Sequence, residues 1–263
     1  MYFFASRRFA RDFRATPLAS VTRTQAREWA LAHRWAKPAI SAMYNDAVRE
    51  GLIQASPFAE LRLPSSRGRR DLEPLAPEQV ERLGEVAFAV HGPDYGRVFR
   101  ALVLFSAWVG LRPGELFALE WKDLQDCTVT IRRCASQLGT LSPPKNGHAR
   151  TVAYPRRARD AVDAMGARAG DGWVFQGAHG QQLRYWSFLR DWMPVRAAFG
   201  RPHMHFYELR HFCASRLMAA GVAPKVIAMQ LGHRDGGTLV MSTYGHLYPE
   251  QALAQVRAAI DIE

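Results

Sequence analysis

The sequence predicts a mainly α-helical protein with a small antiparallel β-sheet, divided into two unequal domains. Apolar residues recur at helical spacing through residues 22–54, and a strongly apolar helix is expected over 98–109. Residues 128–132 and 150–154 alternate in polarity as strands do, and Asn146-Gly147 between them is a strong β-hairpin signal. With 263 residues, 48% of them hydrophobic, the chain can bury the core that such a fold needs.

The first predicted domain covers residues 1–66 and is helical. Its sequence indicates two or three helices that end near Gly51, with buried faces marked by Trp29, Ala32, Trp35, Ala36, Ile40, Met43, Ala47 and Leu52. Residues 67–71 belong to a polar, cationic stretch with nothing to bury, which predicts a linker. The second domain then covers residues 72–263.

Helices of the second domain are expected to begin at prolines and end at glycines. Pro77 starts the first of them, and Gly110 breaks the apolar helix, which resumes at Pro113 because proline is tolerated in a first helical turn. Further helices are predicted at roughly 156–168, 181–198, 208–220 and 224–232, with a last one from Pro249.

Positive charge is concentrated at the start of the chain. The net charge is +11, and residues 1–70 hold 13 Lys and Arg against 5 Asp and Glu, so this quarter carries +8 of it. Such a surface attracts polyanions, with nucleic acid the first candidate and anionic membrane the second. A basic protein kept soluble by its charge is the third explanation. Arg67, Arg69 and Arg70 of the linker are the DNA-binding residues we expect.

Cysteine usage and hydropathy indicate the compartment. The three cysteines, Cys127, Cys134 and Cys213, lack metal-ligand spacing and cannot form a disulfide framework, which suits a reducing cytoplasm. Residues 101–111 are too short to span a bilayer, and the N-terminal charges follow the apolar residues, the reverse of a secretory signal. We expect a cytoplasmic, nucleoid-associated protein with no membrane partner and no bound metal.

Six residues far apart in the sequence form a set that can attack a phosphodiester: Arg112, Lys145, Arg210, His211, His233 and Tyr244. Two permanently charged, planar guanidinium groups can hold both non-bridging oxygens of the phosphate and neutralise the charge that repels a nucleophile. The Tyr244 phenol would be that nucleophile. His233 would donate a hydrogen bond to a phosphoryl oxygen, and Lys145 would give a proton to the leaving 5′ oxygen.

Each of these residues also has an ordinary explanation. Arg112 could be a turn residue, Arg210 a charge on an exposed helix face, and Lys145 a solvated turn residue. His211 could be a core histidine and His233 a helix C-cap. Tyr244 alone would most often be a packing aromatic, and Tyr248 competes with it as a nucleophile. Lys145 stands out because the chain uses arginine almost throughout and has only four lysines, Lys37, Lys122, Lys145 and Lys225.

Four stretches carry a resemblance to a known family. Gly-Leu-Arg-Pro-Gly-Glu-Leu (110–116), Leu-Arg-His-Phe-Cys-Ala-Ser (209–215), Leu-Gly-His (231–233) and Tyr-Gly-His-Leu (244–247) resemble, in order and spacing, the signature boxes of the tyrosine recombinases, or phage integrases. The resemblance covers about residues 72–250 and implies the catalytic-domain architecture of that family. The N-terminal helices, which end in residues 47–53 and 56–58, are similar to its core-binding domain, so the two domains would clamp duplex DNA.

The resemblance implies site-specific DNA recombination or integration. Tyr244 would form a 3′-phosphotyrosyl bond and release a 5′ hydroxyl, and a 5′ hydroxyl from a partner strand would reverse the step without ATP, metal or other cofactor. Glu115 and His211 would support the site. The expected partners are double-stranded DNA with a specific recombination site and three further copies of the chain, as a homotetramer on two sites. Residues 249–263 could dock on a neighbouring subunit, and an accessory DNA-bending factor is left open.

Three departures from the family pattern stand beside this resemblance. Tyr207 occupies the position where the family usually has a histidine, three residues before the second arginine, and a phenol is a poor proton shuttle at neutral pH. The segment from His233 to Tyr244, read as a loop with Gly236-Gly237, is slightly long. Residues 1–66 leave no room for a separate arm-site-binding domain, so Met1 is expected to mark a truncation or a misassigned start.

Two other functions fit the same residues. A type IB topoisomerase-like nicking and closing enzyme would use the same cluster without a partner strand. A catalytically weakened DNA-binding relic would keep the clamp without turnover, as Tyr207 and the short N-terminal region suggest.

Overall fold

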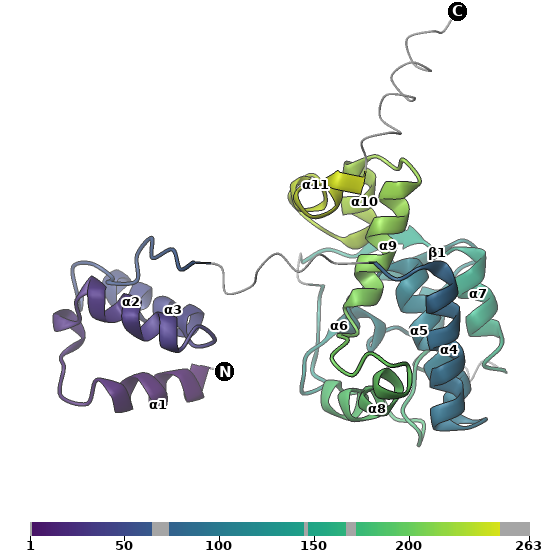
Figure 1. Cartoon of the computed structure of the whole chain (residues 1–263), viewed down its shortest axis with the longest axis horizontal. Coiled ribbons are helices and arrows are strands. Elements are labelled where there is room, and N and C mark those ends of the chain that lie inside the picture. The colour runs from purple at the N-terminus through teal and green to yellow at the C-terminus, as the bar shows by residue number, and fades with distance from the viewer. Residues whose placement is uncertain (1, 65–73, 145–146, 167–171, 248–263) are drawn as a thin grey trace, which may run out of the picture. The chain divides into compact units, whose positions relative to one another are not determined.

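The computed structural model describes residues 2–64, 74–144, 147–166 and 172–247, and the chain divides into two compact units, Met1–Leu72 and Glu73–Glu263. The predicted fold class is confirmed: helices dominate and the strands form small antiparallel pairs (Figure 1). Within the described ranges, none of the helices has the length and apolar character needed to cross a membrane.

The first unit packs its helices around an aromatic core. Its elements are α1 (Tyr2–Asp12), the short 3-10 helix η1 (Leu18–Ser20), α2 (Arg23–Ala32) and α3 (Lys37–Arg49). Phe9 of α1 meets Trp29 and Tyr44 edge to face, with ring centroids 5.0 and 5.8 Å apart, a geometry that aromatic quadrupoles favour. Hydrophobic burial of these rings holds the three helices together.

Two features of this unit differ from the sequence prediction. The helix α1 was not expected. The two or three helices predicted within residues 22–54 are found as two, with an interruption between the end of α2 at Ala32 and the start of α3 at Lys37. The interruption changes which side of the chain faces the core, so Trp35 is half exposed and Leu52 is exposed instead of buried.

The second unit is built around the apolar helix α5 (Tyr95–Val109), as predicted from its composition. Ten of its residues are buried, and it packs against α4 (Pro77–His91), α7 (Arg156–Asp163) and α9 (Glu208–Ala219). The helix α8 (Tyr185–Ala198) packs on α4 (Figure 1). Gly110 ends α5 in the left-handed conformation that favours glycine, and Pro113 opens the short helix α6 (Pro113–Leu116).

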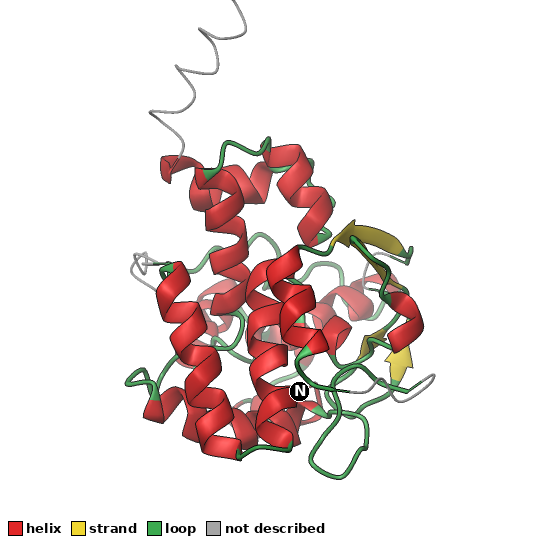
Figure 2. Ribbon diagram, turned by 90° about the vertical axis from the view of Figure 1, so that its right-hand side faces the viewer, coloured by secondary structure: helices red, strands yellow, loops and turns green. Residues whose placement is uncertain are grey.

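Two strand pairs lie along one side of the helices (Figure 2). The strands β1 (Thr128–Ile131) and β4 (Arg150–Ala153) pair antiparallel, as the alternating polarity predicted. A tight hairpin directly joining them was wrong, because β2 (Cys134–Ala135) and β3 (Leu141–Ser142) form a second pair in the connection. Asn146 of the expected turn lies outside the described residues. The 3-10 helix η2 (Trp121–Asp123) precedes β1.

The C-terminal helices are α10 (Pro224–Leu231), α11 (Thr238–Tyr244) and the 3-10 helix η3 (Gly245–Leu247). The reading of residues 233–244 as a loop was wrong in its second half, which is α11. The Asp235 carboxylate accepts hydrogen bonds from the backbone N–H groups of Gly237 (3.1 Å) and Leu239 (3.0 Å), so it satisfies donors at the start of that helix. The helix predicted from Pro249 lies outside the described residues.

Candidate active site

Three arginines converge on the last turn of α10. Arg112 Nη2 donates to the carbonyl of Gly232 (2.8 Å), Arg210 Nη2 to that of Leu231 (2.6 Å), and Arg150 Nη2 lies 3.5 Å from the same Leu231 oxygen. The last carbonyls of a helix lack intrahelical partners and form the negative end of its dipole. The end of α10 is therefore a natural acceptor for guanidinium groups and gathers them in one place.

A buried carboxylate holds two of these arginines. Glu115 is only 1% exposed and accepts from the Arg112 backbone N–H (3.0 Å), from Arg112 Nη1 (3.0 Å), and from both terminal nitrogens of Arg150 (2.8 Å each). Burial acts to raise the Glu115 pKa, but the hydrogen bonds and charges of Arg150 and Arg112 outweigh it and the pKa is lowered. Glu115 is therefore an ionised counterion at neutral pH.

Arg210 is buried, with 2% of its surface exposed, so the exposed-face explanation for this residue is wrong. It lies on α9, and its Nη1 also donates to the Gly110 carbonyl at 2.7 Å. Burial, with the nearby Arg112 charge, lowers its pKa from a value so high that the group stays a cation at pH 7. The described contacts engage three of the five N–H groups of Arg210, counting its contact with His233.

His233 enters the cluster through the glycine that ends α10. Gly232 adopts a φ of 70°, and a Cβ there would lie 2.6 Å from Arg150 Cζ, so only glycine fits. His233 Nε2 lies 3.0 Å from Arg210 Nη2 and must accept, because a guanidinium only donates. Burial and the Arg210 charge lower the His233 pKa, so the ring is neutral and its proton resides on Nδ1.

Tyr244 ends α11 beside this cluster. Its side chain is 7% exposed and belongs to a hydrophobic group that includes Cys213 and Val240. The Tyr244 hydroxyl and His211 Nδ1 form a hydrogen bond between α11 and α9. Burial raises the pKa of Tyr244 well above its ordinary value, while the charge of Arg210 opposes the rise. In this conformation the phenol is protonated and shielded from solvent.

Tyr207 stands at the N-terminal boundary of α9 and is 40% exposed. Arg210 Cζ lies 5.8 Å from the centre of its ring, and the His211 ring lies 5.2 Å from it. An arginine at this distance over an aromatic face is a cation–π contact. The position of Tyr207 is thus beside the cluster, with its ring against two of the site residues.

The structure brings Arg112, Glu115, Arg210 and His233 into one hydrogen-bonded group, with the His211–Tyr244 pair next to it on α9 and α11. Arg150 belongs to the same group and was missed by sequence reasoning. It had no motif signal, because only the pairing of β4 with β1 brings it to Glu115. Lys145, Arg67, Arg69 and Arg70 lie outside the described residues.

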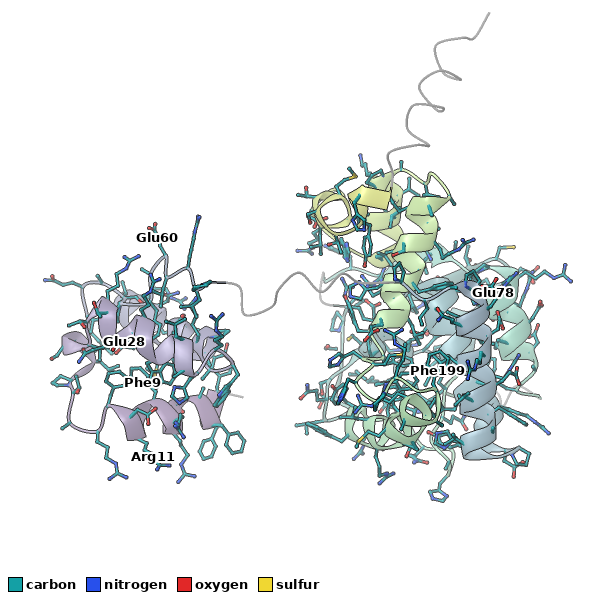
Figure 3. All side chains as sticks on the ribbon, in the orientation of Figure 1. Phe9, Arg11, Glu28, Glu60, Glu78 and Phe199 are labelled. Atoms are coloured by element: carbon teal, nitrogen blue, oxygen red, sulfur yellow. The ribbon has the colours of Figure 1, made fainter. Side chains whose placement is uncertain are left out.

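A second basic feature lies on α1 and was also missed. We call it the α1 stripe: the exposed residues Arg7, Arg8 and Arg11 of α1 with Arg14 in the turn after it, which line a shallow hollow with Phe4 and Ala10. Figure 3 shows Arg11 pointing away from the unit while Phe9 faces the other helices. The spacing of Arg7, Arg11 and Arg14 by four and three residues was the available signal, since such positions share one helix face.

No group of three His, Cys, Asp or Glu side chains suited to a metal ion occurs in the portions of the chain that the structure describes. The acidic residue of the site, Glu115, is instead fully engaged with arginines. The arrangement offers fixed positive charge, neutral imidazoles and a phenol.

Comparison with known proteins agrees with this geometry. Residues 74–251 match the phage integrase family. The tyrosine recombinase XerC of Mycobacterium bovis is 30% identical over 234 residues, which are 84% of this chain and 72% of the relative. Other curated relatives, from a bacterium and from mycobacteriophages, are 22–27% identical, and the chain spans 56–69% of their length.

Solved structures show the same fold at lower identity. The Tn1549 transposon integrase in complex with a circular intermediate DNA superposes with a TM-score of 0.75 at 18% identity, covering 97% of this chain and 93% of that one. A lambda integrase tetramer bound to a Holliday junction gives 0.63 at 18% identity, covering 90% and 71%. With three signature boxes meeting at the end of α10, the Tyr244 box beside them, and a family match over most of the chain, this protein belongs to the phage integrase family of tyrosine recombinases.

Proposed function

We propose that this chain is a site-specific DNA recombinase or integrase that cleaves and rejoins strands through a 3′-phosphotyrosyl intermediate on Tyr244. The observation that carries the proposal is the convergence of Arg112, Arg210 and His233 on one helix end, with Tyr244 beside them. Preorganised donors of this kind stabilise the charge that develops on phosphoryl oxygens during in-line attack.

Each residue has a part in the proposed reaction. Arg112 and Arg210 would donate hydrogen bonds to the two non-bridging oxygens of the phosphate. Glu115, itself held by Arg150, would orient the Arg112 side chain. His233, whose Nε2 accepts from Arg210, would offer Nδ1–H to the phosphate. Lys145 would protonate the leaving 5′ oxygen, because an ammonium on a flexible stem suits that task.

The proposed partner is duplex DNA, bound by both units. The α1 stripe adds four exposed guanidinium groups to the expected basic linker residues Arg67, Arg69 and Arg70. The structural relatives named above are bound to DNA, and one of them is a tetramer on a Holliday junction. A homotetramer on two sites is therefore the assembly we propose, with an accessory DNA-bending factor and a cytoplasmic, nucleoid-associated location as further parts of the proposal.

The function can be tested with DNA of unspecified sequence. The chain is incubated with a random-sequence duplex library, and DNA that becomes covalently attached to protein is recovered under denaturing conditions and sequenced. We expect one enriched site, and mass spectrometry of the digested adduct should place the nucleotide on Tyr244. Tyr244→Phe should fold and bind the selected duplex but form no adduct. An adduct on Tyr248 or Tyr207, or one that persists in Tyr244→Phe, contradicts the assignment.

The same duplex separates recombination from the other two functions. A recombinase should convert a plasmid with two copies of the site into exchanged products. A type IB topoisomerase-like enzyme would give no exchanged products, and it would relax supercoiled plasmids with one site or two sites equally well. A DNA-binding relic would bind the library without any covalent capture.

A further inference from the structure

The Tyr244 hydroxyl is already paired with a base. His211 Nδ1 and the Tyr244 hydroxyl form a hydrogen bond that joins α9 to α11, and the phenol is 7% exposed. Bulk water therefore has little access to the hydroxyl. A nucleophilic phenol must lose its proton as it attacks, so the acceptor must be a group that reaches this oxygen.

The other candidate groups of the site are poorly suited to that task. Tyr207 carries a phenol, and a neutral phenol oxygen is a much weaker proton acceptor than a neutral imidazole nitrogen. The lone pair of His233 Nε2 is used by Arg210 Nη2 at 3.0 Å. The guanidinium of Arg210 only donates.

We propose that His211 is the catalytic base that takes the Tyr244 proton during DNA cleavage, an inference that rests on the proposed function. His211 follows Arg210 directly on α9, so one turn of helix holds both the phosphate-binding cation and the proton acceptor. A tyrosine at position 207, where the family usually has a histidine, then leaves the reaction with a base, because His211 follows Arg210 whereas Tyr207 precedes it.

The protonation state of His211 fits this role. The groups that face the imidazole are Glu208 and Arg210 from α9, Tyr207 at its start, and Tyr244 from α11. Burial lowers the His211 pKa, Glu208 opposes this and Arg210 adds to it, with a net decrease from the ordinary value of 6.5. His211 is therefore neutral at pH 7, and Nδ1 can accept.

Cleavage moves one proton to His211 and exchanges one P–O bond for another. The Tyr244 oxygen forms a bond to phosphorus while its proton passes to His211 Nδ1, giving an imidazolium. The P–O5′ bond breaks, and the 5′ oxygen leaves with its electron pair and takes a proton from the Lys145 ammonium of the proposed function or from water. Because burial raises the pKa of Tyr244, a free phenolate does not form first, and the proton moves as the new bond forms. In rejoining, His211 returns the proton to Tyr244.

His211→Asn is the test, because its amide oxygen can keep a hydrogen bond to Tyr244 near the place of Nδ1 but cannot take the proton. His205→Asn, at an exposed position just before α9, is the matched control. Single-turnover cleavage is measured on a nicked form of the duplex selected by covalent capture. We expect His211→Asn to slow cleavage about 100-fold or more with unchanged DNA affinity and melting temperature, and His205→Asn to match the wild type.

Two further readouts separate a base from a positioning residue. The wild-type rate should fall as pH drops below 6.5, since a protonated His211 cannot accept, and His211→Asn should lack this acidic limb. A duplex with sulfur in place of the bridging 5′ oxygen needs no proton on its leaving group, so it should leave the His211→Asn defect in place.

The outcomes are distinct. Relief of the defect by the sulfur substrate would make His211 an acid toward the leaving group and overturn the proposal. Wild-type cleavage by His211→Asn, with the adduct still on Tyr244, overturns it while the proposed function stands. A wild-type chain that forms no adduct overturns both. If His211→Asn does not fold, the 15N shift of His211 Nδ1 decides: it should change in Tyr244→Phe, and an unchanged shift rejects the hydrogen bond.

Discussion

Replacing Glu115 by Gln removes the counterion of the arginine cluster while keeping its shape. Glu115 is 1% exposed and accepts four hydrogen bonds, three of them from guanidinium groups. Losing one partner of a buried ion pair costs about 3–5 kcal/mol because the other charge stays buried without compensation. Gln keeps part of the hydrogen bonding, so we expect about 3 kcal/mol. For a unit of about 150–250 residues, that corresponds to a melting temperature lower by about 6–12 °C.

Glu85→Gln is the matched control. Glu85 also accepts from an arginine, Arg100 Nε at 2.8 Å, but its side chain is 63% exposed. Exposed pairs contribute about 1 kcal/mol or less, because water screens them and both side chains lose freedom. Thermal unfolding followed by calorimetry, which can resolve the two units, should therefore show a small shift for Glu85→Gln. Equal shifts for the two variants would refute the assignment of Glu115 as a buried counterion.

A comparison of the wild type with Glu115→Gln also gives a pH test with a definite sign. The pKa of Glu115 is lowered in the folded state from its ordinary value of 4.5. Its stabilising contribution is thus present above that value and is lost as pH falls through the folded pKa. The gap in stability between wild type and Glu115→Gln should be full at pH 7 and close upon acidification below 4.5. A gap that does not shrink in acid would contradict the mechanism.

Three further changes have defined outcomes. Gly232→Ala should destabilise by more than Gly200→Ala in thermal unfolding, because both glycines end a helix with positive φ, at a shared cost of about 1–2 kcal/mol, but only the first pushes a Cβ against Arg150; equal effects would reject that clash. Tyr207→His should fold and cleave at least as fast as wild type in the single-turnover assay, and loss of folding would make Tyr207 a packing residue. Replacing the arginines of the α1 stripe by Gln should weaken duplex binding and lower the slope of its salt dependence by about 0.9 for each phosphate that is no longer neutralised, and an unchanged slope excludes the stripe from the interface.

The sequence predicted what depends on local pattern. The apolar run of α5, the glycine stop at Gly110 and the alternating strands β1 and β4 all have short-range causes, and each was found. The division of residues 22–54 into separate helices was also predicted, whereas the helix α1, whose Phe9 packs on Trp29, was missed. The helix α11 was missed because Asp235 caps it across a pair of glycines that look like loop residues.

The candidate site divides in the same way. Arg112, Arg210, His233 and Tyr244 were found because each lies in a recognisable motif, although their roles remain proposals. Arg150 has no motif, and its importance comes from a strand pairing between residues far apart in sequence. The hydrogen bond between His211 and Tyr244 joins two residues 33 positions apart on different helices and likewise has no local signature.

The charges of the cluster explain why its parts depend on one another. The cluster contains three guanidinium groups and one carboxylate, Glu115, which pairs with two of them, and His233 is neutral, so the cluster keeps an excess of positive charge. The guanidinium groups repel one another, and the carbonyls at the end of α10 offset the repulsion only in part. An anion that binds there supplies the missing charge, so binding of a phosphodiester and stability of the cluster favour each other. The excess charge that destabilises the cluster by itself is the same charge that would stabilise the transition state.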